Sequence, residues 1–124
     1  MNNRQRMRTT NKMVRQWLLK EGYDEIWFKP HTKRNDWVFT QKGNYMATDL
    51  WNLFDGMAYD KFGNLIFLQM KTNAWAKEKD IVKFTKNHNH SLVLIFNVTN
   101  KMASCKGHYK LFTRMYNGEG KLDI

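Results

Sequence analysis

The sequence predicts one α/β domain with a mixed central β-sheet flanked by helices. Three observations support this prediction. Apolar residues recur at helical spacing near the N-terminus, two strand-like segments flank a turn at residues 60–64, and the run Leu92–Phe96 is continuously apolar, as in a strand buried on both faces. With 124 residues, of which 42% are hydrophobic and 15% aromatic, the chain has the size and apolar content of one folded unit.

An N-terminal helix is expected from about Asn11 to Glu21, because apolar residues recur there three and four positions apart. Gly22 can end this helix. Residues 1–10 carry arginines among polar residues without apolar periodicity, so we expect a flexible basic arm ahead of a single domain at residues 11–117. The apolar positions of the helix are Met13, Val14, Trp17 and Leu18.

Strands are expected next. Ile26–Phe28 forms the first, and Trp37–Phe39 resumes a strand after Pro30 and a polar loop. Leu53–Tyr59 and Leu65–Lys71 then form two strands joined by a short turn.

The second half of the chain supplies the remaining elements. Asn73 can cap a helix running from about Ala74 to Asn87, which has an apolar face and a lysine-rich face. Ser91–Val98 is expected as a buried strand and His108–Tyr116 as the last strand, followed by a frayed tail at residues 118–124. With Ile26–Phe28 and Trp37–Phe39 taken as one interrupted strand, the expected order is therefore helix, three strands, helix, two strands.

The chain carries a large excess of positive charge. Its 21 Lys and Arg residues against 11 Asp and Glu residues give a net charge of +10, which points to a polyanionic partner. Nucleic acid is favoured over a membrane because no apolar run is long enough to span a bilayer. A basic surface kept only for solubility is the alternative. The cations expected to contact phosphates are Arg4, Arg6, Arg8, Lys12, Arg15, Lys29, Lys33, Arg34, Lys77 and Lys79.

The single cysteine limits the chemistry of the chain. Cys105 has no second cysteine to pair with, so an intrachain disulfide and a cysteine-based zinc site are both excluded. This usage fits a reducing, intracellular and cytoplasmic setting. The basic N-terminus is not followed by an apolar segment, so no signal peptide is expected.

Hairpin geometry brings polar side chains together within residues 53–71. If residues 60–64 form the loop, the residue numbers of each cross-strand pair add up to 124. Asp55 then faces Gln69, with Cβ atoms roughly 5 Å apart. Side chains alternate along a strand, so Lys71 lies on the same face as Gln69, roughly 7 Å away. A slip of one residue would send Asp55 to the opposite face. In this register a carboxylate, an amide and an ammonium converge.

Such a group of side chains suits phosphodiester hydrolysis. Asp55, the carbonyl oxygen of Gln69 and the backbone carbonyl of Met70 can hold Mg²⁺, with Mn²⁺ as a substitute, and the metal polarises a phosphate and acidifies a bound water. Lys71 can orient or deprotonate that water, or stabilise charge on the phosphate, and the sequence does not choose between these roles. The alternative is a strand that simply emerges into solvent at Gln69.

The segment Asp49–Ala58 together with Leu65–Asn73 resembles PD-(D/E)xK nucleases, whose pattern is an Asp ending one strand and an acid-x-Lys on the next. It is similar in particular to small members related to Holliday-junction resolvases. The resemblance implies a restriction-endonuclease-like core, in which Asp55 takes the place of the metal-binding Asp. It likewise implies that Gln69 takes the place of the second acid and Lys71 that of the catalytic Lys.

Two positions depart from the family pattern. Gln69 stands where Asp or Glu is usual, which removes one negative charge from the metal site and should lower its affinity for Mg²⁺. Counting back from Gly22 and Tyr23 puts Asn11 where the family's first helix commonly offers Glu. Carboxylates that could substitute are Glu21, Asp24 and Glu25, and Asp49 is a further candidate for the metal site.

The leading functional hypothesis is a structure-selective, Mg²⁺-dependent DNA endonuclease, resolvase-like and homodimeric, so that two active sites cut two strands symmetrically. A restriction, repair or nicking nuclease of the same type is the nearest alternative. A DNA-binding module that kept the fold and lost catalysis is the alternative from a different class, because Gln69 and Asn11 replace usual acids.

Overall fold

The computed structural model describes residues 3–29, 37–40, 43–46 and 53–123 and has a mixed α/β architecture. A six-stranded sheet has the strand order β1-β4-β5-β6-β7-β8, and a separate two-stranded sheet pairs β2 with β3. The helices are α1 (Asn3–Lys20) and α2 (Glu78–Asn87), with a 3-10 helix η1 (Ala103–Cys105). The strands are β1 (Asp24–Phe28), β2 (Trp37–Thr40), β3 (Gly43–Met46), β4 (Gly56–Tyr59), β5 (Leu65–Thr72), β6 (Leu92–Thr99), β7 (Lys110–Asn117) and β8 (Gly120–Leu122).

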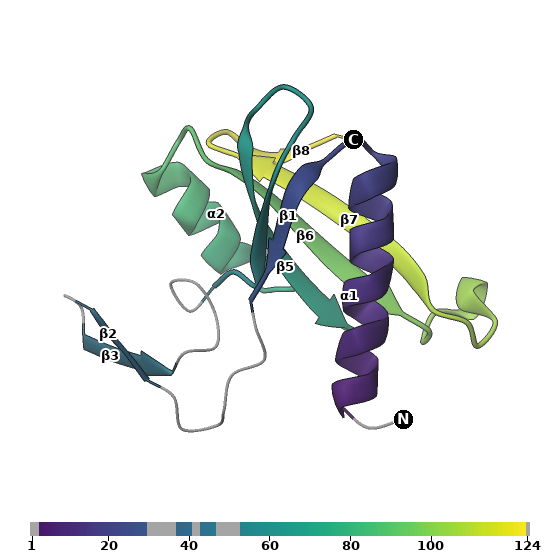
Figure 1. The fold of residues 1–124 in the computed structure, drawn as a ribbon. Helices are drawn as coiled ribbons and strands as arrows, with labels where there is room; N and C mark the ends of the chain where they lie inside the picture. Colours follow the sequence, from purple (N-terminus) through teal and green to yellow (C-terminus); the bar gives the residue numbers. More distant parts are fainter. Residues whose placement is uncertain (1–2, 30–36, 41–42, 47–52, 124) are drawn as a thin grey trace.

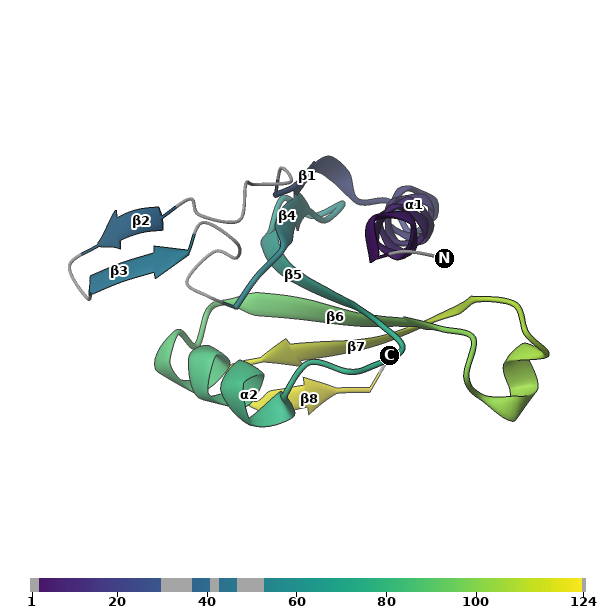
Figure 2. The same ribbon diagram turned by 90° about the horizontal axis from the view of Figure 1, so that it is seen from below.

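The large sheet is mixed, as the sequence predicts. β5 and β6 are parallel, and every other pair of neighbours in this sheet is antiparallel. Helix α1 lies over one face and α2 over the other, as Figures 1 and 2 show. Within the described residues, no helix is long and apolar enough to cross a membrane.

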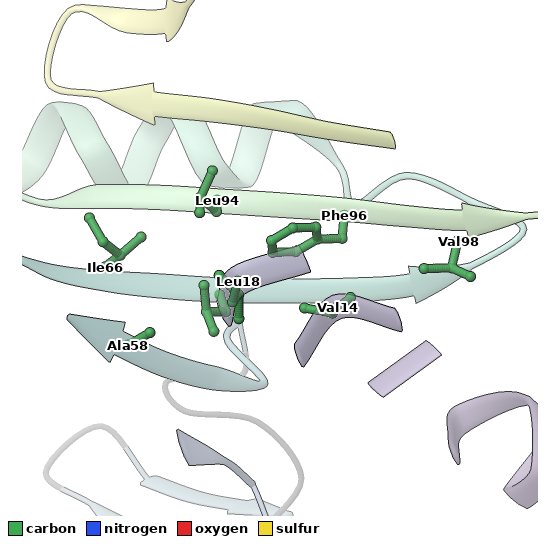
Figure 3. Close-up of a cluster of buried hydrophobic side chains, with 8 residues drawn as sticks. Val14, Leu18, Ala58, Ile66, Leu94, Phe96 and Val98 are labelled. Atoms are coloured by element: carbon green, nitrogen blue, oxygen red, sulfur yellow. The ribbon is translucent and has the colours of Figure 1, made fainter. Parts of the chain in front are cut away.

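Helix α1 covers the first hydrophobic core. Val14 and Leu18 are fully buried against side chains of β5 and β6, including Ile66 and Phe96 (Figure 3). The Trp17 ring meets the Phe96 ring edge-on, with ring centroids 5.4 Å apart. Even-numbered residues of β5 and β6 therefore face α1.

The helix begins earlier than the sequence predicts. It starts at Asn3 rather than Asn11, so the expectation of a flexible arm is wrong for residues 3–10. Thr10 is only 3% exposed, and its hydroxyl is hydrogen-bonded to the hydroxyl of Thr72 on β5 (2.6 Å). Tertiary contact thus supports helical turns whose sequence lacks apolar periodicity.

A second core lies between the sheet and α2. Phe54, Ile81, Val93, Ile95 and Tyr116 are fully buried there. The Phe54 ring stacks on Phe67, with centroids 5.1 Å apart, and meets Phe84 edge-on at 4.8 Å. Odd-numbered residues of β5 and β6 therefore face α2.

Helix α2 begins at Glu78, so the predicted start at Ala74 and the predicted cap at Asn73 are both wrong. Asn73 has a left-handed backbone (φ 58), which asparagine tolerates better than most residues. Its side-chain oxygen accepts hydrogen bonds from Thr99 Oγ1 (2.8 Å) and the Asn100 N–H (3.1 Å). The Arg114 guanidinium lies over the Trp75 ring, with its Cζ 3.9 Å from the ring centroid. This contact holds the segment before α2 against β7.

The C-terminal end is ordered as a strand, so the expected frayed tail is wrong for residues 120–122. β8 pairs with β7 through Met115 and Leu122, Tyr116 and Lys121, and Asn117 and Gly120. The intervening turn packs closely against the loop after α2, because a Cβ on Gly118 would lie 2.7 Å from the Asn89 carbonyl oxygen.

Candidate active site

The β4–β5 hairpin has the predicted register. Gly56 pairs with Leu68, Met57 with Phe67, and Tyr59 with Leu65. β4 is shorter than the expected strand from Leu53, but the Asp55 N–H still donates to the Leu68 carbonyl (2.8 Å). The ladder therefore reaches the candidate site.

The Asp60 side chain holds the turn that fixes this register. Its Oδ1 accepts hydrogen bonds from the N–H groups of Phe62 (2.9 Å) and Asn64 (2.8 Å). Its Oδ2 accepts one from Asn64 Nδ2 (3.1 Å), and Gly63 takes the positive φ of 85 that the turn requires.

The carboxylate of Asp55 is held by groups from two neighbouring strands. Its Oδ2 accepts a hydrogen bond from the Met70 N–H of β5 (2.8 Å). Its Oδ1 lies 3.4 Å from Lys29 Nζ, just beyond the end of β1, and the Lys29 N–H donates to the Asp55 carbonyl (2.7 Å). The side chain of Asp55 is 13% exposed, so this ion pair is only partly screened by water.

Gln69 and Asp55 meet as the register predicts. With the amide oriented to satisfy its neighbours, Gln69 Nε2 donates to Asp55 Oδ2 (2.6 Å) and to the Leu53 carbonyl (2.9 Å). Gln69 is only 8% exposed. In this arrangement the Gln69 nitrogen, rather than its oxygen, faces the carboxylate, so Gln69 positions Asp55 and does not present an oxygen beside it.

Lys71 shares the α2 face of β5 with Gln69 but is exposed. Within the described part of the chain, no hydrogen bond or ion pair joins its ammonium to Asp55. The structure thus joins Asp55 to Gln69 and leaves Lys71 two residues further along, at the solvent-exposed end of the strand.

Gly56 lets β1 approach the site. A Cβ at this position would lie 2.5 Å from the Trp27 carbonyl oxygen and 2.9 Å from Phe28 Cδ1. β1 also carries an irregularity between Asp24 and Trp27, where Glu25 has a φ of 48. The close approach of β1 brings Lys29 to Asp55.

The predicted metal ligands have distinct surroundings. Asp55 supplies a carboxylate, and Met70 is seen donating its N–H to that carboxylate, while ligation by the Met70 carbonyl stays a prediction. Among the described residues, no three His, Cys, Asp or Glu side chains gather to hold a metal ion. Glu21, Asp24 and Glu25, named as substitutes for the missing acid, are exposed at the end of α1 and the start of β1.

Most of the predicted phosphate-binding cations belong to the two helices, which lie on opposite faces of the sheet (Figure 1). Arg4, Arg6, Arg8, Lys12 and Arg15 belong to α1, whereas Lys77 and Lys79 lie at the start of α2. The Arg15 guanidinium rests 4.8 Å from the centroid of the Phe28 ring. Lys29 is engaged by Asp55. Lys33, Arg34 and Asp49 lie outside the described residues.

Asn97 is a residue that the sequence reasoning missed. It pairs with Lys71 across the parallel β5–β6 ladder and is 8% exposed. Its Oδ1 is buried and, among the described residues, has no hydrogen-bond partner. A lone polar residue inside the apolar run of β6 was the available signal, because a buried amide needs a partner.

Comparison of the chain with protein-family models, curated proteins and solved structures finds no match. The resemblance to PD-(D/E)xK nucleases therefore stays a prediction from the sequence motif.

Proposed function

We propose that the chain is a metal-dependent DNA endonuclease of the PD-(D/E)xK type, structure-selective and resolvase-like. The contact between Asp55 and Gln69 carries the proposal, because it joins two motif positions that lie 14 residues apart in a single buried arrangement. Lys71 follows on the same strand face, where its exposed ammonium is accessible to a phosphate.

The donor chemistry at Asp55 fits Mg²⁺ or Mn²⁺. Mg²⁺ in phosphate-processing sites is often held by one or two carboxylates, with water and substrate phosphate completing its shell. Asp55 would hold it through its carboxylate, in which Oδ2 accepts from the Met70 N–H and Gln69 and Oδ1 pairs with Lys29, so a bound metal ion would replace the Lys29 pair. A bound metal ion would acidify a water and neutralise charge on the phosphate.

The side chains around Asp55 have separate roles in this proposal. Gln69 fixes the carboxylate by donating two hydrogen bonds, one to Asp55 and one to the Leu53 carbonyl. Lys29 pairs with Asp55 in the structure, and a metal ion bound at Asp55 would replace this pair and let Lys29 contact a substrate phosphate. Lys71 orients or deprotonates the attacking water, or stabilises the charged phosphate.

A DNA-binding module without catalysis is the second candidate. The contacts of Asp55 favour this candidate. Lys29, Met70 and Gln69 already pair with its carboxylate, as they would with a carboxylate that has only a structural role. A restriction, repair or nicking nuclease of the same type would share the site and differ only in substrate.

A homodimer belongs to the proposal because symmetric cutting of two strands needs two sites. Exposed apolar side chains on the hairpin and on the neighbouring strand β1 could contribute to such an interface. Trp27, Tyr59 and Leu65 are 44%, 42% and 38% exposed. The molar mass in solution, measured by light scattering, tests this part.

Cleavage assays separate the candidates. The protein is incubated with a four-way junction, linear duplex or single-stranded DNA, in the presence of Mg²⁺, Mn²⁺ or EDTA. Metal-dependent cutting confined to the junction supports the resolvase-like function, and cutting of linear duplex supports another nuclease. Binding without cutting in any metal contradicts the enzyme and supports the binding module.

A further inference from the structure

A basic pocket lies on the α1 side of the molecule, at the carboxyl ends of the parallel strands β5 and β6. It encloses about 400 Å³ and is lined by Arg6, Met7, Thr72, Asn73 and Lys101. Arg6 comes from the first turns of α1, Thr72 and Asn73 end β5, and Lys101 follows β6. Three segments that are distant in sequence therefore meet at one cavity.

The polar groups of the pocket are suited to an anion. Arg6 and Lys101 each carry a full positive charge, and among the described residues no carboxylate lines the pocket and neither cation makes an ion pair. The first turn of α1 carries no acidic residue, and the dipole of the helix adds positive potential there. The lining is thus rich in donors and lacks a competing negative charge.

The side-chain amide of Asn73 is oriented so that its nitrogen can donate to a ligand in the pocket. Its side-chain oxygen already accepts two hydrogen bonds, from Thr99 Oγ1 and the Asn100 N–H. Its amide nitrogen is the part left for a ligand. Thr99 Oγ1 also accepts the Lys101 N–H (3.1 Å), so the same small network fixes the backbone that carries the lysine.

The wall toward α1 is equally fixed. Thr72 and Thr10 join β5 to α1 through their hydroxyls (2.6 Å), one turn beyond Arg6. Arg6 therefore stands on a helix that is tied to the same strand end as Asn73. The Asn73 amide and the backbone at Lys101 are thus held in place before any ligand arrives, which reduces the entropy lost on binding, whereas the side chains of Arg6 and Lys101 are exposed.

We propose that this pocket binds a backbone phosphate of the DNA strand engaged by the candidate active site. The identity of the anion rests on the proposed function. The pocket itself is not lined by Asp55, so its binding of an anion can be tested separately. Thr72 is three residues beyond Gln69 on β5, roughly 10 Å along the strand, but the two side chains project to opposite faces of the sheet. A DNA strand that contacts both the pocket and Asp55 would therefore pass around the carboxyl end of β5, where Lys71 is exposed.

The first experiment tests the anion chemistry with inorganic phosphate. The full chain is titrated by NMR with phosphate against chloride at constant ionic strength. We expect saturable shifts of the Lys101 amide and the Asn73 side-chain amide in the parent, and loss of these shifts in the Arg6→Ala, Lys101→Ala double variant. The absence of saturable shifts in the parent would overturn the pocket as an anion site.

The second experiment asks whether the anion is part of DNA. Affinity for duplex and for a four-way junction is measured at several salt concentrations for the parent, the double variant and Lys86→Ala, which removes an exposed charge at the end of α2. We expect the double variant to bind at least about tenfold more weakly, with a salt slope reduced by about one unit. Lys101→Arg should retain binding and Lys86→Ala should match the parent.

The outcomes separate this inference from the proposed function. If the parent cuts DNA and the double variant binds DNA with unchanged affinity and slope, the pocket inference fails and the nuclease stands. If phosphate binds in the pocket but the chain binds no DNA, the DNA occupant and the proposed function both fail. If the parent binds DNA without cutting it, and the double variant binds DNA more weakly than the parent, the result supports the pocket inference and contradicts catalysis.

Discussion

At the scale of single residues, Gln69 decides how the candidate site is built. A glutamine can donate to Asp55 and to the Leu53 carbonyl at the same time, whereas a carboxylate at this position can donate to neither unless protonated. The acid that the nuclease pattern usually carries here would face another carboxylate. It would therefore depend on a cation between them.

Gln69→Glu is accordingly expected to make folding depend on metal. In EDTA the substitution loses two hydrogen bonds and places like charges together, so the free energy of unfolding should fall by about 2 kcal/mol or more. Mg²⁺ should restore stability more strongly in the variant than in the parent, since it binds only the folded state. Thermal unfolding with and without Mg²⁺ measures both effects.

The matched control combines Gln69→Glu with Asp55→Asn. Removing one of the two charges should recover stability in EDTA and abolish the extra stabilisation by Mg²⁺. If Mg²⁺ stabilises the Gln69→Glu variant no more than the parent, the metal does not bind between residues 55 and 69.

At the scale of elements, the approach of β1 to β4 is the feature on which Lys29 depends. Gly56→Ala would put a Cβ 2.5 Å from the Trp27 carbonyl oxygen, which is backbone and cannot swing aside. We expect a loss of about 1–3 kcal/mol in unfolding free energy, as for overpacked sites. Chemical denaturation measures this loss, and a Gly56→Ala variant as stable as the parent would contradict the tight strand contact.

The turn of the hairpin gives a second expectation, in its pH dependence. Burial raises the pKa of Asp60, but hydrogen bonds from Asn64 and Phe62 outweigh it and hold the pKa below its ordinary value of 3.8. A depressed folded pKa means that the carboxylate stabilises the fold above pH 3.8 and that this contribution is lost as pH falls through the folded pKa.

Asp60→Ala should therefore lower the melting temperature by a few degrees at neutral pH, and the difference from the parent should vanish in strong acid. Asp60→Asn, which keeps an acceptor oxygen for the turn, should lose less. Melting curves over a pH series test this. A gap between parent and Asp60→Ala that is unchanged in acid would show that the charge of Asp60 does not support the turn.

The elements also show what the sequence could and could not reveal. The register of β4 and β5 was predictable because one short polar turn separates two apolar segments, which fixes the pairing of Asp55 with Gln69. The first turns of α1 were missed because their support is the tertiary contact between Thr10 and Thr72. The late start of α2 follows from the left-handed Asn73 and from Trp75 packing on Arg114, which local propensity does not encode.

At the scale of the whole molecule, charge dominates the expected behaviour. Among the described elements, α1 is basic throughout and carries no acidic residue, whereas at the start of α2 Glu78 and Asp80 alternate with Lys77 and Lys79. Distance in sequence hid the pocket at Arg6, Asn73 and Lys101, since only the fold brings these three segments together. A strand of DNA contacting both faces would have to pass around the end of the sheet.

DNA affinity should therefore fall steeply with salt. If about six phosphates are neutralised, affinity should drop about a thousandfold between about 50 and about 200 mM salt, because counterions are released on binding. Fluorescence anisotropy with labelled duplex measures the slope. An affinity indifferent to salt over this range would contradict the polyanion argument.

The central claim is that Asp55 and Lys71 perform catalysis at a site that can be separated from DNA binding. Asp55→Asn keeps the shape of the side chain and removes the charge that would hold the metal, so cleavage should fall by orders of magnitude while DNA affinity is maintained. Lys71→Ala should also abolish cutting, and since Lys71 is exposed, its loss should leave the fold intact.

The most direct measurement is single-turnover cleavage of a four-way junction in Mg²⁺, run in parallel with junction binding in EDTA. The parent, Asp55→Asn, Lys71→Ala and the control Lys86→Ala are compared. The account predicts cutting by the parent and Lys86→Ala only, with binding by all four proteins. Parent-like cutting by both Asp55→Asn and Lys71→Ala would contradict it.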